Sequence, residues 1–494
     1  MFELTMGQSV NKMTTQNTAN LLKKYPPPYL IVGMGKSGSA TKRLLLTIGV
    51  PSSSIFTFDD KAAADYQDPS LALKETQPKT LVVSPGYHLK KPWIVQAKQN
   101  GLQITSELTL ASFYLSSEKV IGVTGSVGKS TVCALLGSAF DELREPALVC
   151  GNFGFPLADY AADVLEKKIA PYRWLVVELS SYQLENCEGL SLSCGVLTSL
   201  TPNHLERYLT KDHYYASKLA LFRMSSKFKI CGTQSNGLFA FLNELAQGHH
   251  LQALEDMGIQ DLSFLNHLLL AEQSSLVSDR WASQLGFAQK FFDLSKTMDL
   301  HLGGVKNQRL IGQHNLINIL ICMAVFRCFG FSDQADHALL NFPGLAHRLE
   351  NLGENNQILF INDSKATTLE SVITASKTLQ SSYPQRTSWL LIGGKDKNLP
   401  WQDLSSLQSL PQLRYVFFGE CGRLAHEKSQ LPGQVYSSLK SALADLKTHL
   451  LPGHVVLLSP GGTSFDEFKS FEDRGNFFKT WVKDNFSSEP ATLP

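Results

Sequence analysis

The stretch of the chain best suited to chemistry is residues 120–131, Val-Ile-Gly-Val-Thr-Gly-Ser-Val-Gly-Lys-Ser-Thr. An apolar run leads into glycines and is followed by an apolar helical period, which predicts a strand, a tight turn and a helix. This is the layout of a phosphate loop, in which backbone amides and a helix N-terminus face an anion. Lys129 would reach the β- and γ-phosphates and Ser130 would bind Mg²⁺. Val123 stands where the strict motif has glycine, so a glycine-rich turn with a chance Lys-Ser pair is the alternative. We expect an ATP site.

Polar residues downstream of this loop could complete such a site. Glu178 ends a predicted strand and could be a further Mg²⁺ ligand, with a helix N-cap as the alternative. His204 follows another predicted strand and could bind metal, although a lone histidine is more often structural. Lys218 lies in a predicted helix and by itself would be solvated. Asn315 and Asn318 lie three apart, hence on one helix face, and could contact an adenine edge.

The segment before the loop contains a second glycine-rich turn, Gly33-Met34-Gly35-Lys36-Ser37-Gly38, directly after a short apolar run, Tyr29–Val32, which predicts a strand. Asp59 ends the next predicted strand, 21 residues past Gly38. This is the spacing of a dinucleotide-binding fingerprint with its ribose-binding acid, and the packing glycines of an empty βαβ unit are the alternative. Alone, the segment would suggest a nicotinamide-dependent oxidoreductase. Hydride transfer needs no ATP, however, so the phosphate loop argues against that class.

The last third of the chain contains four predicted strands, and each ends in a polar or glycine-rich turn. Parallel strands bring their carboxyl ends to one rim of a sheet, where doubly wound sheets bind ligands. That rim would hold Asp363, Lys365, Lys397 and Ser464. In contrast, residues 232–310 show no constellation with obvious chemistry, and 237–289 are expected to be mostly helical.

Composition limits the function classes. A chain of 494 residues exceeds one core, so about three domains are expected, and a net charge of +1 gives no field that favours nucleic acid or membrane. The eight cysteines form no C-x-x-C pair, which favours a reducing cytosol over disulfides or a zinc site. No leader-like apolar segment and no run of 18 apolar residues is present, so we expect a cytoplasmic protein.

Taken jointly, nine stretches resemble in content and order the motifs of the Mur ligase family of bacterial cell-wall synthesis. They are Thr-Gly-Ser-Val-Gly-Lys-Ser-Thr (124–131), Gly-Asn-Phe-Gly-Phe-Pro-Leu (151–157), Glu-Leu-Ser-Ser-Tyr-Gln-Leu-Glu (178–185), Asn-His-Leu-Glu-Arg-Tyr (203–208), Ser-Lys-Leu (217–219), Gly-Gln-His-Asn (312–315), His-Arg-Leu-Glu (347–350), Asn-Asp-Ser-Lys-Ala-Thr (362–367) and Ser-Phe-Asp-Glu-Phe (464–468). The resemblance covers about residues 30–480 and is greatest to the members that add D-glutamate to UDP-N-acetylmuramoyl-L-alanine. Val127 departs from it, because the family's loop usually has Asn there.

The resemblance implies an α/β fold with three domains after a polar N-terminal extension (1–28). These are a UDP-substrate-binding Rossmann-like domain (29–115), a central P-loop ATPase domain with a parallel sheet (116–342) and a Rossmann-like C-terminal domain that binds the amino acid (343–494). It implies ATP and two Mg²⁺ ions as cofactors. The implied partners are the small molecules UDP-MurNAc-L-alanine and D-glutamate, with neither nucleic acid nor membrane, and a monomer is expected.

The resemblance also assigns roles by position. Catalytic roles fall on Lys129, Glu178, His204 and Lys218. Metal-binding roles fall on Ser130, Glu178, His204 and a carbamylated Lys218. Nucleotide contacts are Gly125, Ser126, Gly128, Lys129, Ser130, Thr131, Asn315, Asn318, Arg348 and Asp363. Substrate contacts are Lys36, Ser37 and Asp59 for UDP, Asn152 and Ser180 for the muramoyl part, Lys365 in the closed site, and Thr367, Lys397, Ser464 and Phe471 for D-glutamate. A ligase of this kind or a folylpolyglutamate synthase that adds another amino acid is the nearest alternative, and an NAD-dependent oxidoreductase is the alternative from another class.

Overall fold

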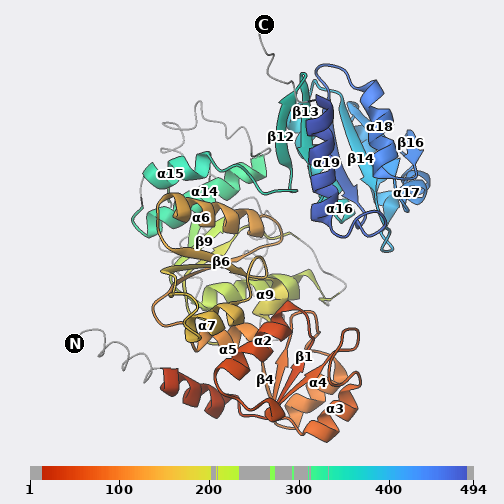
Figure 1. Cartoon of the computed structure of the whole chain (residues 1–494). Coiled ribbons are helices and arrows are strands. Elements are labelled where there is room, and N and C mark those ends of the chain that lie inside the picture. The colour runs from red at the N-terminus through yellow and green to blue at the C-terminus, as the bar shows by residue number, and fades with distance from the viewer. Residues whose placement is uncertain are drawn as a thin grey trace. The chain divides into compact units, whose positions relative to one another are not determined.

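A computed structural model describes residues 14–201, 207–208, 210–232, 268–272, 292–293, 310, 313–331 and 333–486. The described residues form three sheets, which confirms the predicted α/β class (Figure 1). The chain divides into two compact units. One is Met1–Gly304 with Ile317–Leu339, and the other is Val305–Leu316 with Leu340–Pro494.

The first sheet has four parallel strands in the order β2-β1-β3-β4. Its strands and helices are β1 (Tyr29–Val32), α2 (Lys36–Thr47), β2 (Ile55–Phe58), α3 (Pro69–Thr76), β3 (Thr80–Val83), α4 (Pro92–Gln99), β4 (Gln103–Thr105) and α5 (Glu107–Ser112), with a 3₁₀ turn at Ser52–Ser54. All four residues of β1 are buried, as expected of an apolar run between two neighbouring strands. The strand order reverses at β1, and open α/β sheets bind ligands at such a point.

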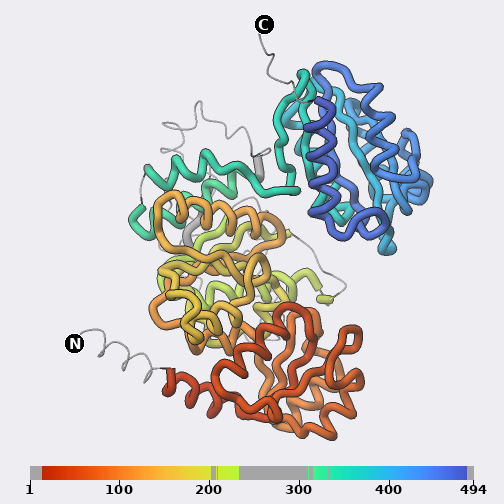
Figure 2. The backbone as a smooth tube through the Cα atoms, in the orientation of Figure 1, coloured from red at the N-terminus to blue at the C-terminus, as the bar shows by residue number. Residues whose placement is uncertain are grey.

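A helix over residues 14–24 precedes this sheet, in the segment that was expected to be a polar extension (Figure 2). Leu21 is fully buried, and Tyr25, just after the helix, is nearly so. The hydroxyls of Thr18 and Tyr114 lie 3.0 Å apart, which joins this helix to the segment after α5. The extension therefore adds apolar residues to the core of the first unit.

The second sheet has seven parallel strands in the order β11-β10-β9-β8-β5-β7-β6. The strands and helices of this part are β5 (Lys119–Thr124), α6 (Lys129–Glu142), β6 (Ala147–Gly151), α7 (Leu157–Leu165), β7 (Trp174–Glu178), α8 (Ser181–Leu184), β8 (Leu192–Leu197), α9 (Lys211–Arg223), β9 (Ser225–Gly232), β10 (Leu268–Glu272), β11 (Phe292–Asp293), α14 (Gln313–Cys328) and α15 (Asp333–Leu340). The stretch 237–289 lies largely outside the described residues. Its described part, β10, is a strand that pairs with β9, so the helical expectation is wrong there, because a short apolar run fits either element.

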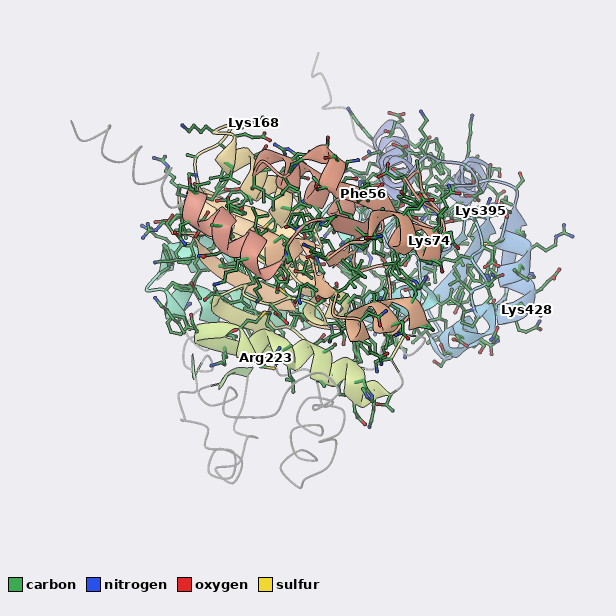
Figure 3. The ribbon with its side chains drawn as sticks, turned by 90° about the horizontal axis from the view of Figure 1, so that it is seen from below. Phe56, Lys74, Lys168, Arg223, Lys395 and Lys428 are labelled. Atoms are coloured by element: carbon green, nitrogen blue, oxygen red, sulfur yellow. The ribbon has the colours of Figure 1, made fainter. Side chains whose placement is uncertain are left out.

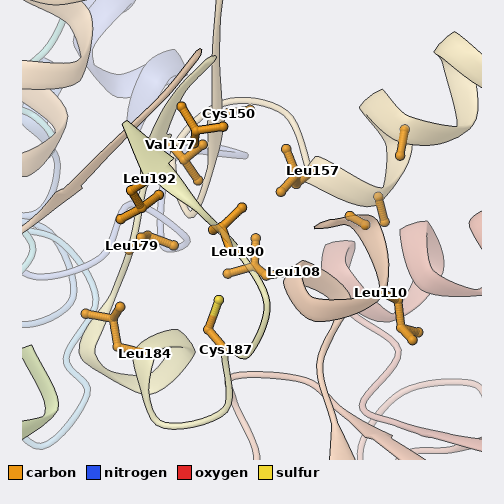
Figure 4. Packing of buried hydrophobic residues seen from close by; sticks show 14 of the residues in the cluster. Leu108, Leu110, Cys150, Leu157, Val177, Leu179, Leu184, Cys187, Leu190 and Leu192 are labelled. Atoms are coloured by element: carbon orange, nitrogen blue, oxygen red, sulfur yellow. The ribbon is translucent and has the colours of Figure 1, made fainter. Parts of the chain in front are cut away.

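One hydrophobic cluster joins the first two sheets (Figure 4). It includes Leu108 and Leu110 of α5, Leu157 at the start of α7, Val177 of β7 and Leu192 of β8. A fully buried leucine contributes about 1.5–3 kcal/mol. The two sheets and their helices therefore belong to one compact unit.

Glu107, the first residue of α5, caps α7 from the other side of this core. Its Oε1 accepts a hydrogen bond from the amide of Ala158 at 2.6 Å, while Pro156, at the N-cap position of α7, makes no side-chain cap bond. Burial raises the pKa of the Glu107 carboxyl to about 7, and the amide offsets only part of that effect. The Glu107 carboxyl group thus stabilises the N-terminus of α7 and is itself buried.

Glu107 is expected to make the stability of the first unit depend on pH. Its folded-state pKa lies above the usual 4.5, so its stabilising contribution is fully present below pH 4.5 and is lost as pH rises through 7. The difference in unfolding free energy between wild type and Glu107→Gln should fall by about 3 kcal/mol across this window. Urea unfolding at several pH values measures it, and a difference that does not change with pH would contradict the prediction.

The second unit contains a six-stranded sheet in the order β12-β13-β17-β14-β15-β16, parallel except for β12. Its elements are β12 (Glu350–Asn355), β13 (Ile358–Asn362), α16 (Leu369–Ser382), β14 (Ser388–Gly393), the 3₁₀ helix η3 (Trp401–Ser409), β15 (Leu413–Phe418), α17 (Gly422–Ser429), β16 (Gly433–Tyr436), α18 (Leu439–His449), β17 (Val455–Gly461) and α19 (Phe471–Phe486). Two hydrophobic clusters, one containing Trp401 and the other Phe478, bury the two faces of the sheet. This is the doubly wound arrangement expected of the last third of the chain.

The eight cysteines all lie in the described ranges and are free thiols, seven of them buried. Even for Cys328, the half-buried one, burial raises the pKa to about 11, so this thiol stays protonated at neutral pH. Among the described residues, no helix combines the length and the apolar character needed to cross a bilayer.

Candidate active site

The predicted phosphate loop joins β5 to α6. Gly125 and Gly128 have φ angles of +150° and +89°, values that L side chains rarely adopt, and a Cβ on Gly125 would lie 2.0 Å from the Thr198 hydroxyl. The first helical residue is Lys129, and its N-cap residue Gly128 provides no side-chain cap. The start of α6 thus follows a glycine-rich turn without a side-chain cap at Gly128, which is the layout of a phosphate loop, where a helix N-terminus faces an anion.

Two lysines meet at one carbonyl of this loop. Lys129 Nζ donates to the carbonyl oxygens of Gly125 at 2.7 Å and Ser126 at 3.1 Å. Lys218 Nζ, from α9, donates to the same Gly125 oxygen at 2.9 Å. The two lysine side chains thus converge where a phosphate chain would add negative charge.

Lys218 is only 1 % exposed, so the prediction that this side chain is solvated is wrong. It is buried because α9 packs beneath the loop, and the Lys218 ammonium lies over the ring of Tyr214 at 4.7 Å. Burial holds the pKa of Lys218 well below its usual range, and the charge of Lys129 lowers it further. A neutral amine is the nucleophilic form of lysine, which is the chemistry that carbamylation needs.

Glu178 lies beside the start of α6. Ser130 Oγ donates to Glu178 Oε2 at 2.6 Å, and the Asn152 amide donates to Glu178 Oε1 at 2.7 Å. The N-cap alternative for Glu178 is wrong, because Ser180 caps α8 in a capping box with Gln183. A buried carboxylate beside a hydroxyl is a set of hard oxygen donors that fits Mg²⁺.

Other residues predicted to contact the nucleotide lie in the loop and in α14, near Ser130 and Glu178. Ser126 Oγ donates to the Thr201 carbonyl at 2.8 Å and Thr131 is half-buried in the first turn of α6. Asn318 of α14 lies against Gly128, because a Cβ there would be 2.6 Å from the Asn318 Oδ1. Asn315, one turn earlier, is also buried. His204 lies outside the described residues.

Gly128 provides a test of the loop. Gly128→Ala is expected to raise the KM for ATP about 10- to 100-fold, because the left-handed backbone strains an L residue and the new methyl group displaces Asn318. Gly330→Ala is the matched control, since Gly330 has a φ of +84° and no neighbouring atom within 4 Å of an added Cβ. It should lower stability and leave the KM for ATP unchanged. Steady-state kinetics compare the two, and equal effects would contradict the loop's role.

The predicted uridine-diphosphate residues lie at the ends of β1 and β2. Lys36 and Ser37 form the first turn of α2, whose N-cap residue has no side-chain cap bond. Asp59 accepts hydrogen bonds from the amides of Met34, Lys61 and Ala62 at 2.7–2.9 Å. These bonds, first that of Met34, lower the pKa of Asp59, so the carboxylate fixes the loops at the strand ends.

Most of the predicted residues of the second unit lie in the turns after β13, β14 and β17, while Arg348 precedes β12 and Phe471 begins α19. Asp363, after β13, accepts hydrogen bonds from the Leu349 amide at 3.1 Å and the Ser459 hydroxyl at 2.9 Å, and burial raises its pKa to about 7. Lys365 Nζ lies 3.7 Å from the ring centre of Phe471. Of the others, Ser464 is buried, Arg348 and Thr367 are half-buried and Lys397 is exposed.

Arg474 is a residue of this rim that the sequence interpretation missed. Its fully buried guanidinium donates to the carbonyl oxygens of Ser364, Gly462 and Thr463. It thereby joins the turn after β13 to the turn after β17. The helical period that places Phe478 and Val482 on the buried face of α19 also places Arg474 there, so a signal was available.

Comparison with known proteins identifies the chain. Residues 123–326 match the model of the Mur ligase middle domain. A UDP-N-acetylmuramoylalanine–D-glutamate ligase of Desulfitobacterium hafniense (strain Y51) is 32% identical over 485 residues, which cover 92% of this chain and 97% of the relative. The chain belongs to the Mur ligase family. A ligase of the same name from Alkaliphilus metalliredigens is 32% identical over 408 residues, 81% of this chain and 83% of the relative.

The Mur ligase fold is also found among solved structures. The MurF ligase of Thermotoga maritima, solved in complex with ADP, matches with a TM-score of 0.51 and 13% identity over 92% of this chain and 95% of that one. That structure matches the α/β fold, and the family model together with the named relatives makes this Mur ligase an ATP-dependent ligase, as predicted. The relatives are ligases, so the oxidoreductase alternative has no support among them.

Proposed function

We propose that this Mur ligase joins D-glutamate to the carboxyl group of UDP-N-acetylmuramoyl-L-alanine at the expense of ATP, in the synthesis of peptidoglycan precursors. The observation that supports it most is the 32% identity over nearly the whole chain to a ligase named for these substrates. The phosphate loop supports it from the structure, because Lys129 and the open N-terminus of α6 fit a nucleotide phosphate chain.

In the proposed reaction the γ-phosphoryl group of ATP moves to the substrate carboxylate and gives an acyl phosphate. The amine of D-glutamate attacks the acyl carbon, and the amide forms as inorganic phosphate leaves. Lys129 would stabilise the negative charge of the transferring group, and little acid–base chemistry is needed beyond positioning. When bound, Mg²⁺ would neutralise phosphate charge, with Ser130 and Glu178 as ligands of one ion and His204 and a carbamylated Lys218 at a second.

The domain roles follow from the same proposal. The first sheet (29–115) would bind the UDP part through Lys36, Ser37 and Asp59, and the central sheet (116–342) would bind ATP with Asn315 and Asn318. The C-terminal domain (343–494) would supply Arg348, Asp363 and Lys365 near the nucleotide and Thr367, Lys397, Ser464 and Phe471 for D-glutamate. Asn152 and Ser180 would face the muramoyl part of the substrate, and their hydrogen bonds to Glu178 and within the cap of α8 would hold them in place.

A single assay tests the function. Purified enzyme, ATP, Mg²⁺ and UDP-MurNAc-L-alanine are combined with D-glutamate, L-glutamate, L-alanine, L-lysine or diaminopimelate, and phosphate release is measured. We expect phosphate release only when the added amino acid is D-glutamate. Release with a different amino acid would favour a sister ligase. In a parallel reaction with a folate in place of UDP-MurNAc-L-alanine, release with L-glutamate would favour folylpolyglutamate synthesis. No substrate-dependent release would contradict the proposal.

Lys397 should determine the use of D-glutamate. Lys397→Ala is expected to raise the KM for D-glutamate about 10- to 100-fold, because a charge-assisted bond to a carboxylate is lost, and to leave the KM for ATP unchanged. Lys395→Ala is the control. Lys395 is an exposed lysine two positions away, 3.7 Å from Glu420, and projects from the same unit (Figure 3). An unchanged D-glutamate KM in Lys397→Ala would refute the assigned pocket.

A further inference from the structure

Arg207 links the first domain to the central domain through buried contacts. Its side chain is 8 % exposed and its Nη2 lies 3.0 Å from Glu185 Oε2, just after α8. The guanidinium carbon lies 3.8 Å from the ring centre of Tyr182 in α8. On its other side, Nη1 donates to the Pro85 carbonyl at 2.9 Å and Nη2 lies 3.4 Å from the Tyr87 carbonyl. One planar group thus holds main-chain atoms of one domain against a helix of the other.

The turn that Arg207 holds, Ser84–Tyr87, follows β3 and organises the ligand-binding end of the first sheet. The Ser84 hydroxyl donates to the Gly33 carbonyl, after β1, at 2.8 Å. The Tyr87 hydroxyl accepts from the Asp60 amide, after β2, at 2.9 Å. Any shift of the turn would therefore move the ends of β1 and β2 together with that of β3.

The helix that Arg207 contacts, α8, belongs to the central domain, which forms one half of the site; the first domain forms the other half. Ser180 caps α8, and Glu178 ends the strand directly before it. A small cavity between the two halves is lined from both sides, by Ser84, Tyr87, Ser106, Gln183 and Arg207. The guanidinium therefore lies where the spacing between the two halves is set.

A second arginine connects the same two domains and provides a contrast. Arg43 of α2 pairs with Asp159, Asp163 and Glu166, on and just after α7, through side chains that are all partly exposed. Such pairs contribute little, about 0–1 kcal/mol each. Within the described part of the chain, the Arg43 guanidinium donates to these three carboxylates, which do not lie at a strand end, so Arg43 joins the domains without fixing the geometry of the site.

We propose that Arg207 is a positioning residue, which fixes the Ser84–Tyr87 turn against α8 so that the strand ends of both domains meet one nucleotide-sugar substrate at a set spacing. The identity of that substrate rests on the proposed function. The planar guanidinium reaches two carbonyls, a carboxylate and an aromatic face at once, which a lysine cannot do. Arginine is therefore required at this position, and charge alone is insufficient.

The test compares Arg207→Lys with Arg43→Ala in the full-length enzyme. Arg207→Lys should raise the KM for UDP-MurNAc-L-alanine about 10- to 100-fold and leave the KM for ATP unchanged, because a displacement of about 1 Å is enough to cost this much. Arg43→Ala should leave both KM values unchanged. An unchanged UDP-MurNAc-L-alanine KM in Arg207→Lys, or an equal rise in both KM values, would overturn the proposal.

Hydrogen exchange gives a readout that does not depend on the substrate. The amides of Ser84 and Gly86–His88 should exchange faster in Arg207→Lys and at the wild-type rate in Arg43→Ala, and equal protection in all three proteins would overturn the proposal. If wild type fails to turn over D-glutamate, the proposed function fails, while the exchange experiment still decides the role of Arg207. Should Arg207→Lys not fold, Glu185→Gln, which removes the charge that holds Nη2, is measured in the same two ways with the same expected results.

Discussion

Replacing Lys129 with alanine is expected to lower the turnover of this Mur ligase by about 10³-fold, which corresponds to about 4 kcal/mol of transition-state stabilisation. Lys129 Nζ now donates to two carbonyls of its own loop, at 2.7 and 3.1 Å. A phosphate chain would offer it stronger acceptors, and the charge that gathers on the transferring phosphoryl group would strengthen those bonds in the transition state. ADP formation measured by a coupled assay gives the effect.

Lys119→Ala is the matched control for Lys129→Ala. Lys119 begins the strand β5 that leads to the loop, and its ammonium lies 4.7 Å from the ring centre of Trp174. Its removal costs a cation–π contact of about 0.5–1 kcal/mol and leaves the loop intact. We expect Lys119→Ala to keep near-normal turnover. Near-normal turnover in Lys129→Ala as well would remove the ATP site from the proposed mechanism.

Lys218→Met should lower turnover by about 10²- to 10³-fold without loss of stability. Methionine fills a similar space beside Tyr214 and carries no amine that could be carbamylated. Because burial already disfavours the charged form of Lys218, an uncharged side chain is expected to keep or raise the unfolding midpoint. Turnover and thermal unfolding are measured together, so that loss of activity through misfolding is recognised.

Carbamylation of Lys218 has its own measurement. Wild type equilibrated with ¹³C-bicarbonate should show a protein carbamate signal by NMR, and Lys218→Met should not. A fully active Lys218→Met variant would contradict any role of this residue in the reaction. Wild type without a carbamate signal would refute the modification and would leave Ser130, Glu178 and His204 as the proposed metal ligands.

Local features of this chain could be predicted because they depend on neighbours in the sequence. The strand Tyr29–Val32 was expected with the bounds that the structure has, since an apolar run between turn residues suffices to define it. Lys129 and Ser130 could be placed at the start of a helix because the glycines before them interrupt the strand. The capping of α8 by Ser180 also depends only on Gln183, three residues on, but the N-cap considered from the sequence was Glu178 instead.

Residues whose surroundings come from distant parts of the chain could not be predicted in the same way. Lys218 sits in a helix of mixed polarity, and only the packing of α9 under Gly125 buries it. Arg207 follows a polar segment, and its contact with the Pro85 carbonyl spans 122 positions of sequence. The helix over residues 14–24 was overlooked because its polar composition conceals single apolar residues such as Leu21.

By itself, the sequence determined the α/β pattern, the phosphate loop and the family. The apolar periodicity, the residues of the turns and the order of the motifs can all be read from residues that are close together in the chain. The tertiary structure decided which polar groups are desolvated and which pairs meet, such as Glu178 with Ser130 at 2.6 Å. The physical reason is that the pKa of a buried group and the strength of its bonds depend on what surrounds it in space, and parallel strand pairing brings together residues that are tens of positions apart.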